Sequence, residues 1–129
     1  AGQTPAATLA HGQAVSAPGC YVLETPTEHW TEIVTGLGAT GVEMILAHTG
    51  DHPVQGHPLV PVLQVSAGSA VQARYAEDLD LALVGPADAW ANELLDLLVD
   101  VASRCHQPVA VAQHNTDFQF TRGLLGVSM

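Results

Sequence analysis

Short apolar runs are separated along this chain by polar and periodic stretches, and the runs predict β-strands. Three of them stand between glycine, proline or charged residues: residues 20–23 (CYVL), 42–47 (VEMILA) and 61–65 (PVLQV). Runs of this length are typical of strands that are buried within a parallel sheet. We therefore expect a small, mostly parallel sheet that contains all three segments.

A helix is predicted between the first two of these strands. Apolar residues from Trp30 to Leu37 recur at helical spacing, and Thr27 precedes them as a candidate N-cap. The glycines within residues 36–41 predict its end. A strand, a helix and a second strand in this order are the pattern of a βαβ unit.

Further along the chain, a short helix and an edge strand come before the longest helical pattern. The short helix is expected around residues 70–77, and residues 79–84 (LDLALV) alternate as an edge strand or an extended stretch does. We expect Pro108 to close the long helix, and residues 109–129 indicate no definite element. The long helix carries an apolar stripe at helical spacing: Trp90, Leu94, Leu97, Leu98, Val101 and Cys105.

Together these elements predict an α/β fold, a small three-layer Rossmann-like domain in which helices flank a mostly parallel sheet. Residues 19–129 are expected to form this single domain, the C-terminal domain of a larger protein. Residues 1–18 are rich in Ala, Gly, Pro and Ser without periodicity, and predict an extended lead-in that packs on something else. The lead-in and the apolar C-terminal tail favour association with another domain or a second copy.

Charge excludes several classes of function. Thirteen carboxylates face three arginines and no lysine, which gives the chain a net charge of −10. This excess of negative charge repels phosphate backbones and anionic lipids, so we expect no nucleic-acid and no membrane partner. The absence of lysine excludes Schiff-base catalysis and a P-loop.

Cysteine content and the N-terminus indicate a cytoplasmic protein. The two cysteines, Cys20 and Cys105, are too few for the disulfide framework of a small secreted domain, so we expect both to be reduced. The apolar runs fall well short of the roughly 20 residues that cross a bilayer. The N-terminal residues have no initiator Met, no basic leader and no apolar stretch of the signal-peptide type, so the sequence is expected to start in the middle of a longer chain.

A polar loop after the second predicted strand is the main candidate for chemistry. It contains His48, Thr49, Gly50, Asp51 and His52. Loops at the carboxyl ends of parallel strands are where α/β domains bind ligands. Imidazole and carboxylate groups can act as acids, bases or metal ligands, although the spacing matches no zinc motif. The alternative is a solvated polar turn without a function.

Glu24 is a second candidate, since it follows the first predicted strand. If that strand and residues 42–47 are parallel neighbours, Glu24 and His48 share one edge of the sheet. Glu24 could then act as a base or a metal ligand. A carboxylate that caps the helix of Trp30 is the alternative.

Several separated segments of the chain resemble the altronate and galactarate dehydratases, in their C-terminal region. Residues 19–26 (GCYVLETP) are similar to a GLYxMDTP motif of that family, and residues 34–65 are similar to its VTGLxAxGAxLxLFTTGRGTPxGxPxxPVIKV stretch. Residues 77–85 (EDLDLALVG) look like a DxMDINAG stretch, residues 90–103 like the helix that follows, and residues 115–129 like the closing segment. The resemblance spans nearly the whole chain.

The resemblance implies a sugar-acid dehydratase, which removes water from a hexonate or hexarate and yields a 2-keto-3-deoxy acid. It also implies a divalent metal, iron(II) or manganese(II), and a site shared with the remaining domains of the parent enzyme. A homo-oligomer is expected from the lead-in and the apolar C-terminal tail. The isolated chain is then expected to lack turnover. The expected roles are catalysis by His48 and His52, substrate binding by Thr49, Gly50 and Glu24, and metal binding by Asp51.

The sequence departs from the family pattern within this loop. Where the family has TTGRGTP, residues 48–53 read HTGDHP, so Asp51 stands at the arginine position. An arginine would bind a substrate carboxylate, which an aspartate repels. The departure leaves three explanations open: another substrate, a bound cation, or lost activity. The alternative functions are a module that binds a metal or small acid, and a structural or oligomerisation domain.

Overall fold

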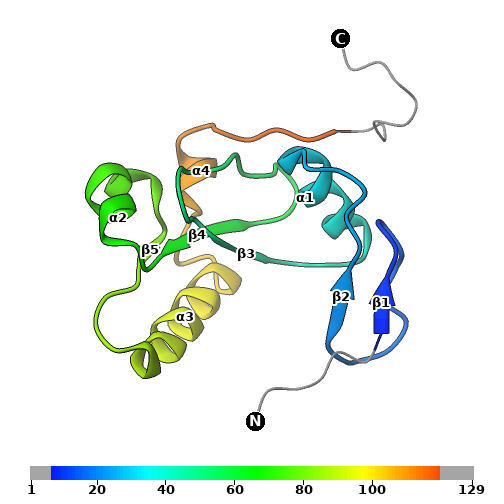
Figure 1. Ribbon diagram of the computed structural model, residues 1–129, viewed down its shortest axis with the longest axis horizontal. Coiled ribbons are helices and arrows are strands. Elements are labelled where there is room, and N and C mark those ends of the chain that lie inside the picture. The colour runs from blue at the N-terminus through cyan, green and yellow to red at the C-terminus, as the bar shows by residue number, and fades with distance from the viewer. Residues whose placement is uncertain (1–6, 120–129) are drawn as a thin grey trace. The chain divides into compact units, whose positions relative to one another are not determined.

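The computed structural model describes residues 7–119 of the chain (Figure 1). Within this range the chain forms two compact units. The first consists of residues 7–43 and 117–119, and the second of residues 44–116. Each unit contains its own small parallel sheet, and each is described by itself.

The first unit is built on two paired strands. Strand β1 (Ala7–Leu9) pairs in parallel with β2 (Tyr21–Leu23), and the β2 strand confirms the prediction for residues 20–23. The lead-in was expected to pack on something outside the chain, which is wrong for residues 7–9. Residues 7–9 pair within the chain, because they can complete the hydrogen bonds of a strand that has no other neighbour.

Helix α1 (Trp30–Ala39) follows β2 and confirms the predicted helix and its end. Its N-cap is His29, not Thr27 as predicted. The Thr27 hydroxyl instead accepts a hydrogen bond from the His29 N–H at 3.1 Å, in a turn ahead of the helix. After the helix, Gly41 has a φ of 95°, which only glycine adopts without strain.

A close contact within the first unit requires glycine at position 36. The imidazole of His11 lies directly over Gly36 of α1, where a β-carbon would collide with the ring. Glycine is unfavourable inside a helix by about 1 kcal/mol relative to alanine. At this position the absence of a side chain allows the segment around His11 to approach the helix.

The second unit contains a three-stranded sheet. Its strands are β3 (Ile45–His48), β4 (Val62–Ser66) and β5 (Leu81–Ala82). Their order is β3-β4-β5 and both pairings are parallel, with Ile45 opposite Val62 and Val65 opposite Leu81. The α/β class with mostly parallel strands flanked by helices is confirmed.

The prediction that all three apolar runs share one sheet is wrong. In the described residues, β2 pairs with β1, whereas β3 pairs with β4. A βαβ pattern in the sequence fixes neither the strand order nor the pairing partner. β2 pairs with residues 7–9, whose surroundings are rich in alanine and polar residues and gave no strand signal.

Four helical segments belong to the second unit. The short helix α2 (Ser69–Tyr75) continues into the 3₁₀ helix η1 (Ala76–Asp78), as expected for residues 70–77. The long helix α3 (Ala87–Ala102) confirms the apolar stripe, and α4 (Val109–Ala112) follows it. None of the helices in the described part of the chain could span a membrane.

The predicted end of α3 is wrong by several residues. The helix ends at Ala102, and Arg104 adopts a left-handed conformation with a φ of 61°. Cys105, which matched the helical spacing, therefore lies beyond the helix and is exposed. Pro108 does not close α3 but stands at the N-cap of α4, where a residue without an N–H is tolerated.

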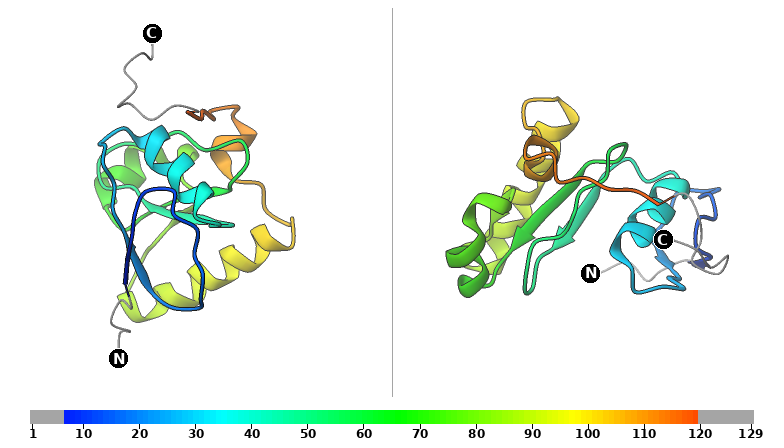
Figure 2. Two further views of the ribbon diagram at one scale, coloured as in Figure 1. Left: turned by 90° about the vertical axis from the view of Figure 1, so that its right-hand side faces the viewer. Right: turned by 90° about the horizontal axis from the view of Figure 1, so that it is seen from above.

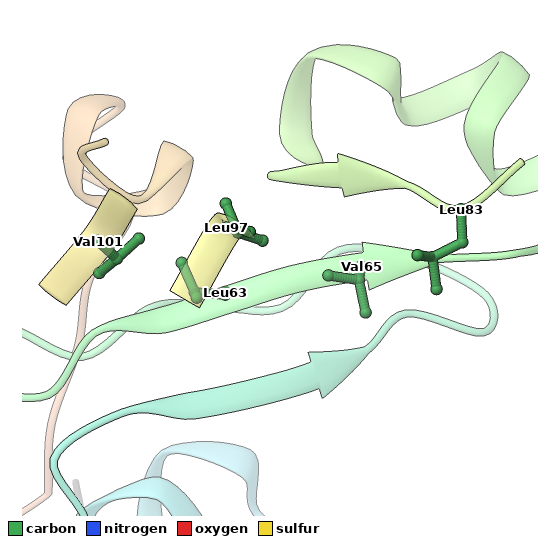
Figure 3. Packing of buried hydrophobic residues seen from close by; sticks show 5 residues of the cluster. All are labelled: Leu63, Val65, Leu83, Leu97 and Val101. Atoms are coloured by element: carbon green, nitrogen blue, oxygen red, sulfur yellow. The ribbon is translucent and has the colours of Figure 1, made fainter. Parts of the chain in front are cut away.

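The core of the second unit lies between the sheet and α3 (Figure 3). Leu63 and Val65 of β4 form one buried cluster with Leu97 and Val101 of α3 and with Leu83, which follows β5. Side chains alternate along a strand, so the neighbouring residues of β4 point to the opposite face. All residues of β4 are buried, which makes it the central strand of the unit. Figures 1 and 2 show α2, α3 and α4 around this sheet.

Candidate functional site

The predicted loop begins at the carboxyl end of β3. His48 is the last residue of this strand, and residues 49–61 connect it to β4. In a parallel sheet the carboxyl ends of the strands lie along one edge, which is the usual place of a ligand site. The location that was predicted for the loop is therefore confirmed.

Thr49 is buried and its backbone is fixed on both sides of the residue. Its N–H donates to the Val65 carbonyl at 2.8 Å, and its carbonyl accepts from the Ser66 hydroxyl at 2.7 Å. Only 3% of Thr49 is exposed, yet its hydroxyl has no hydrogen-bond partner among the described residues. A buried hydroxyl without a partner costs free energy, so this group is a candidate for a ligand contact.

The rest of the loop tip is open to solvent. His48 and Gly50 are exposed, and a β-carbon on Gly50 would lie 3.8 Å from Cε1 of the His48 ring. The side chains of Asp51 and His52 are 97% and 72% exposed, with Asp51 Oδ2 at 3.5 Å from His52 Nδ1. The loop thus brings a buried hydroxyl and exposed imidazoles to one end of β3.

The loop alone does not form a complete metal site. Imidazole and carboxylate oxygen are suitable ligands for iron(II) and manganese(II). Among residues 7–119, however, no three histidine, cysteine, aspartate or glutamate side chains are arranged to hold a metal ion. Asp51 and His52 are the two candidate ligands of the loop that the structure brings close together.

Glu24 is not placed beside His48 by a shared sheet. It follows β2, and its N–H donates to the Leu9 carbonyl at 2.9 Å, so it extends the pairing of β1 and β2. The shared sheet edge from which we predicted its role is therefore wrong. The Glu24 side chain is exposed.

Comparison with protein families gives one match over almost the entire chain. The model of the family described as D-galactarate/altronate dehydratase, C-terminal, matches residues 2–124. The chain belongs to this family. The resemblance that was identified from the sequence segments is thereby confirmed, while no curated protein matches the chain.

The second half of the loop of this dehydratase domain is anchored to the sheet. The Val54 N–H donates to Oε1 of the buried Gln64 at 2.7 Å. Gly56 forms an isolated bridge with Thr116, and its N–H donates to the Asn115 carbonyl at 2.9 Å. These contacts hold the loop against β4 and the segment after α4, so its exposed tip starts from a fixed base.

His57 is a buried histidine within the same loop. It is 5% exposed, and its Nδ1 accepts a hydrogen bond from the Leu59 N–H at 3.2 Å. Burial disfavours the charged imidazolium and lowers the pKa of His57 below its usual value of 6.5. The neutral ring is therefore the form that the fold accommodates.

We expect His57 to make the domain less stable in acid. Below pH 6.5 the unfolded chain binds a proton at this residue more readily than the folded chain does, so stability falls as the pH decreases from there toward the lowered pKa. His57→Asn retains an acceptor for the Leu59 N–H but does not titrate. Urea unfolding at about pH 7.5 and about pH 5.5 should show a smaller loss of stability in this variant than in the wild type. Equal losses would contradict the prediction.

A buried carboxylate in the dehydratase domain was missed in the sequence. The Asp80 side chain is fully buried, and Oδ1 lies 2.9 Å from His106 Nε2 and 2.9 Å from the Val109 N–H. Oδ2 accepts from the Gln64 N–H at 2.7 Å. One sequence signal was present, since Asp80 interrupts the apolar segment of residues 79–84. His106 lies 26 residues away, so no local motif could reveal the pair.

Proposed function

We propose that this chain is the C-terminal domain of an enzyme that dehydrates a sugar acid. The substrate class is a hexonate or hexarate, and the product is a 2-keto-3-deoxy acid. The observation that carries this proposal is the family match over residues 2–124. The proposal includes a site that residues from outside this domain complete, so that this domain alone does not turn over substrate.

The end of β3 is the part of this domain that we assign to the site. Thr49 offers a buried hydroxyl that has no partner among the described residues, and His48 offers an exposed imidazole next to it in the chain. Gly50 is exposed and has no side chain of its own, so a ligand can approach its backbone. A sugar acid has several hydroxyl groups and a carboxylate, which such donors and acceptors can bind.

Dehydration requires one base and one acid. The base removes the proton from the carbon next to the carboxylate. The acid protonates the hydroxyl on the following carbon, and this hydroxyl leaves as water. The resulting enol tautomerises to the 2-keto-3-deoxy acid. Histidine serves in either role near neutral pH. We assign these proton transfers to His48 and His52, whereas Thr49 and Gly50 bind the substrate.

The proposed iron(II) or manganese(II) would stabilise negative charge on the substrate when bound. Because residues 7–119 contain no three suitable ligands in one place, the described residues alone do not hold the metal. Asp51 is the ligand that we propose from the loop, with His52 beside it. The other ligands would then come from the rest of the polypeptide.

The test is turnover by the natural polypeptide that contains this domain. A panel of hexonates and hexarates is assayed for 2-keto-3-deoxy acid in the presence of ferrous or manganous ion. Loss of a general acid or base is expected to lower kcat by about 100-fold or more in His48→Gln. His29→Gln is the matched control, since His29 is also exposed but lies at the start of α1.

Each outcome has a defined meaning. Turnover that is lost in His48→Gln and kept in His29→Gln supports the proposal. Equal turnover in both variants would remove the loop from the site, and absence of turnover with every acid would contradict the dehydratase assignment. Asp51→Arg introduces the family's arginine. A gain of turnover on hexarates would indicate that Asp51 has changed the substrate preference, and it would contradict the proposed role of Asp51 as a metal ligand.

A further inference from the structure

Helix α3 has a second apolar face that nothing in its own unit covers. The inner face packs on the sheet through Leu94, Leu97 and Val101. Leu95 and Val99, one turn apart, are 58% and 59% exposed. With the exposed Ala91 and Ala102 they form what we call the outer face of α3.

The outer face has the spacing of a packing surface. Its residues, Ala91, Leu95, Val99 and Ala102, recur at steps of three or four and therefore lie along one side of the helix. Two large aliphatic residues between alanines present a ridge that a second structural element can approach closely. Surface helices of a globular domain usually carry a polar face at this position.

A row of carboxylates runs beside the outer face. Asp88, Asp96 and Asp100 are exposed and recur at multiples of four residues, so they follow the helix next to Leu95 and Val99. Within residues 7–119 none of these carboxylates has a salt-bridge partner. The outer face is thus apolar with a negative border.

The charge decides which partner fits. A second copy of this chain would bring acidic borders together, because the chain has a net charge of −10 and no lysine. Residues 7–43 of the first unit contain neither lysine nor arginine, so they cannot pair with the row either. The complementary surface is apolar at its centre and basic at its border.

We propose that the outer face of α3 is a docking surface, and that its occupant is such a basic-bordered apolar surface on the remaining region of the dehydratase polypeptide. This inference rests on the proposed function, in which another region completes the enzyme. Leu95 and Val99 form the buried centre of the contact, while Asp96 and Asp100 pair with lysine or arginine at its border.

The test measures the accessibility of a thiol in the natural polypeptide. Val99→Cys places a thiol on the outer face, and Ala73→Cys places one on an exposed position of α2 as the control. The rate of maleimide labelling at each site is measured by mass spectrometry. This rate is divided by the labelling rate of the same site in denaturant. Docking is expected to slow labelling of Val99→Cys about tenfold or more relative to Ala73→Cys. Adding Asp96→Lys and Asp100→Lys should restore fast labelling.

Three results would overturn the proposal. The first is labelling of Val99→Cys as fast as that of Ala73→Cys. The second is protection that the Asp96→Lys and Asp100→Lys changes leave unaltered, since the border of the occupant would then not be basic. The third is protection that disappears on dilution, which identifies a second copy as the occupant. Labelling requires no turnover, so an inactive polypeptide with a protected outer face would reject the proposed function and retain the docking surface.

Discussion

Replacement of Asp80 by alanine is expected to lower the free energy of unfolding by about 3 to 5 kcal/mol. The carboxylate is fully buried and accepts hydrogen bonds from the backbone of Gln64 and Val109 and from the His106 ring. Alanine would leave these donors without an acceptor in the interior, which costs more than the loss of the bonds themselves. The bonds also connect β4, β5 and the segment that leads into α4.

Urea unfolding measures this effect. In a Trp30→Phe background the fluorescence reports on Trp90 of α3, which packs against the core of the same unit. Asp78→Ala removes a nearby carboxylate for which the structure gives no side-chain hydrogen bond, and should change stability by less than about 0.5 kcal/mol. His106→Ala removes a single donor from Asp80 and should cost about 1 kcal/mol. A cost for Asp80→Ala no larger than that of His106→Ala would show that the backbone donors find other acceptors.

The elements of the second unit were largely predictable, for a local reason. The strands β3 and β4 are short, mostly apolar runs, and α3 has apolar residues at helical spacing over several turns. In both cases one stretch of sequence contains the full signal. The end of α3 was not predictable in this way, since Cys105 matched the spacing while the left-handed Arg104 already breaks the helix.

Pairing between distant segments was the main point that the sequence could not determine. β1 has three residues in a segment rich in small and polar residues, and it becomes a strand by pairing with β2. Hydrogen bonding to a neighbour, and not local propensity, decides such a case. The position of Glu24 was therefore predicted on the wrong sheet edge, since β2 belongs with β1.

The candidate site was predictable in its location but not in its details. The polar residues after β3 marked the loop, and their place at the carboxyl end of a parallel strand follows from the fold class. The different environments of Thr49 and Asp51 could not be predicted, because burial of Thr49 depends on its bonds to Val65 and Ser66 of β4. The Asp80 and His106 pair depends on tertiary contact in the same way.

Replacement of Leu63 by alanine is the second large effect that we expect, a loss of about 3 kcal/mol or more of unfolding free energy. Leu63 is 0% exposed and lies in the core cluster on β4, the strand that pairs with both β3 and β5. Truncation removes buried apolar atoms and leaves a cavity that the paired strands cannot collapse to fill.

Leu59→Ala is the matched control for Leu63→Ala, because it makes the same chemical change at a residue that is 83% exposed. It should alter stability by no more than about 0.5 kcal/mol. Both variants are measured by urea unfolding with Trp90 fluorescence, whose signal comes from the helix that packs on Leu63. A similar small change in both variants would mean that the interior between β4 and α3 tolerates a cavity, in contrast to a close-packed core. A large loss in Leu63→Ala alone would show that packing between β4 and α3 stabilises the sheet. The same packing would then hold the loop that begins at Thr49 in place.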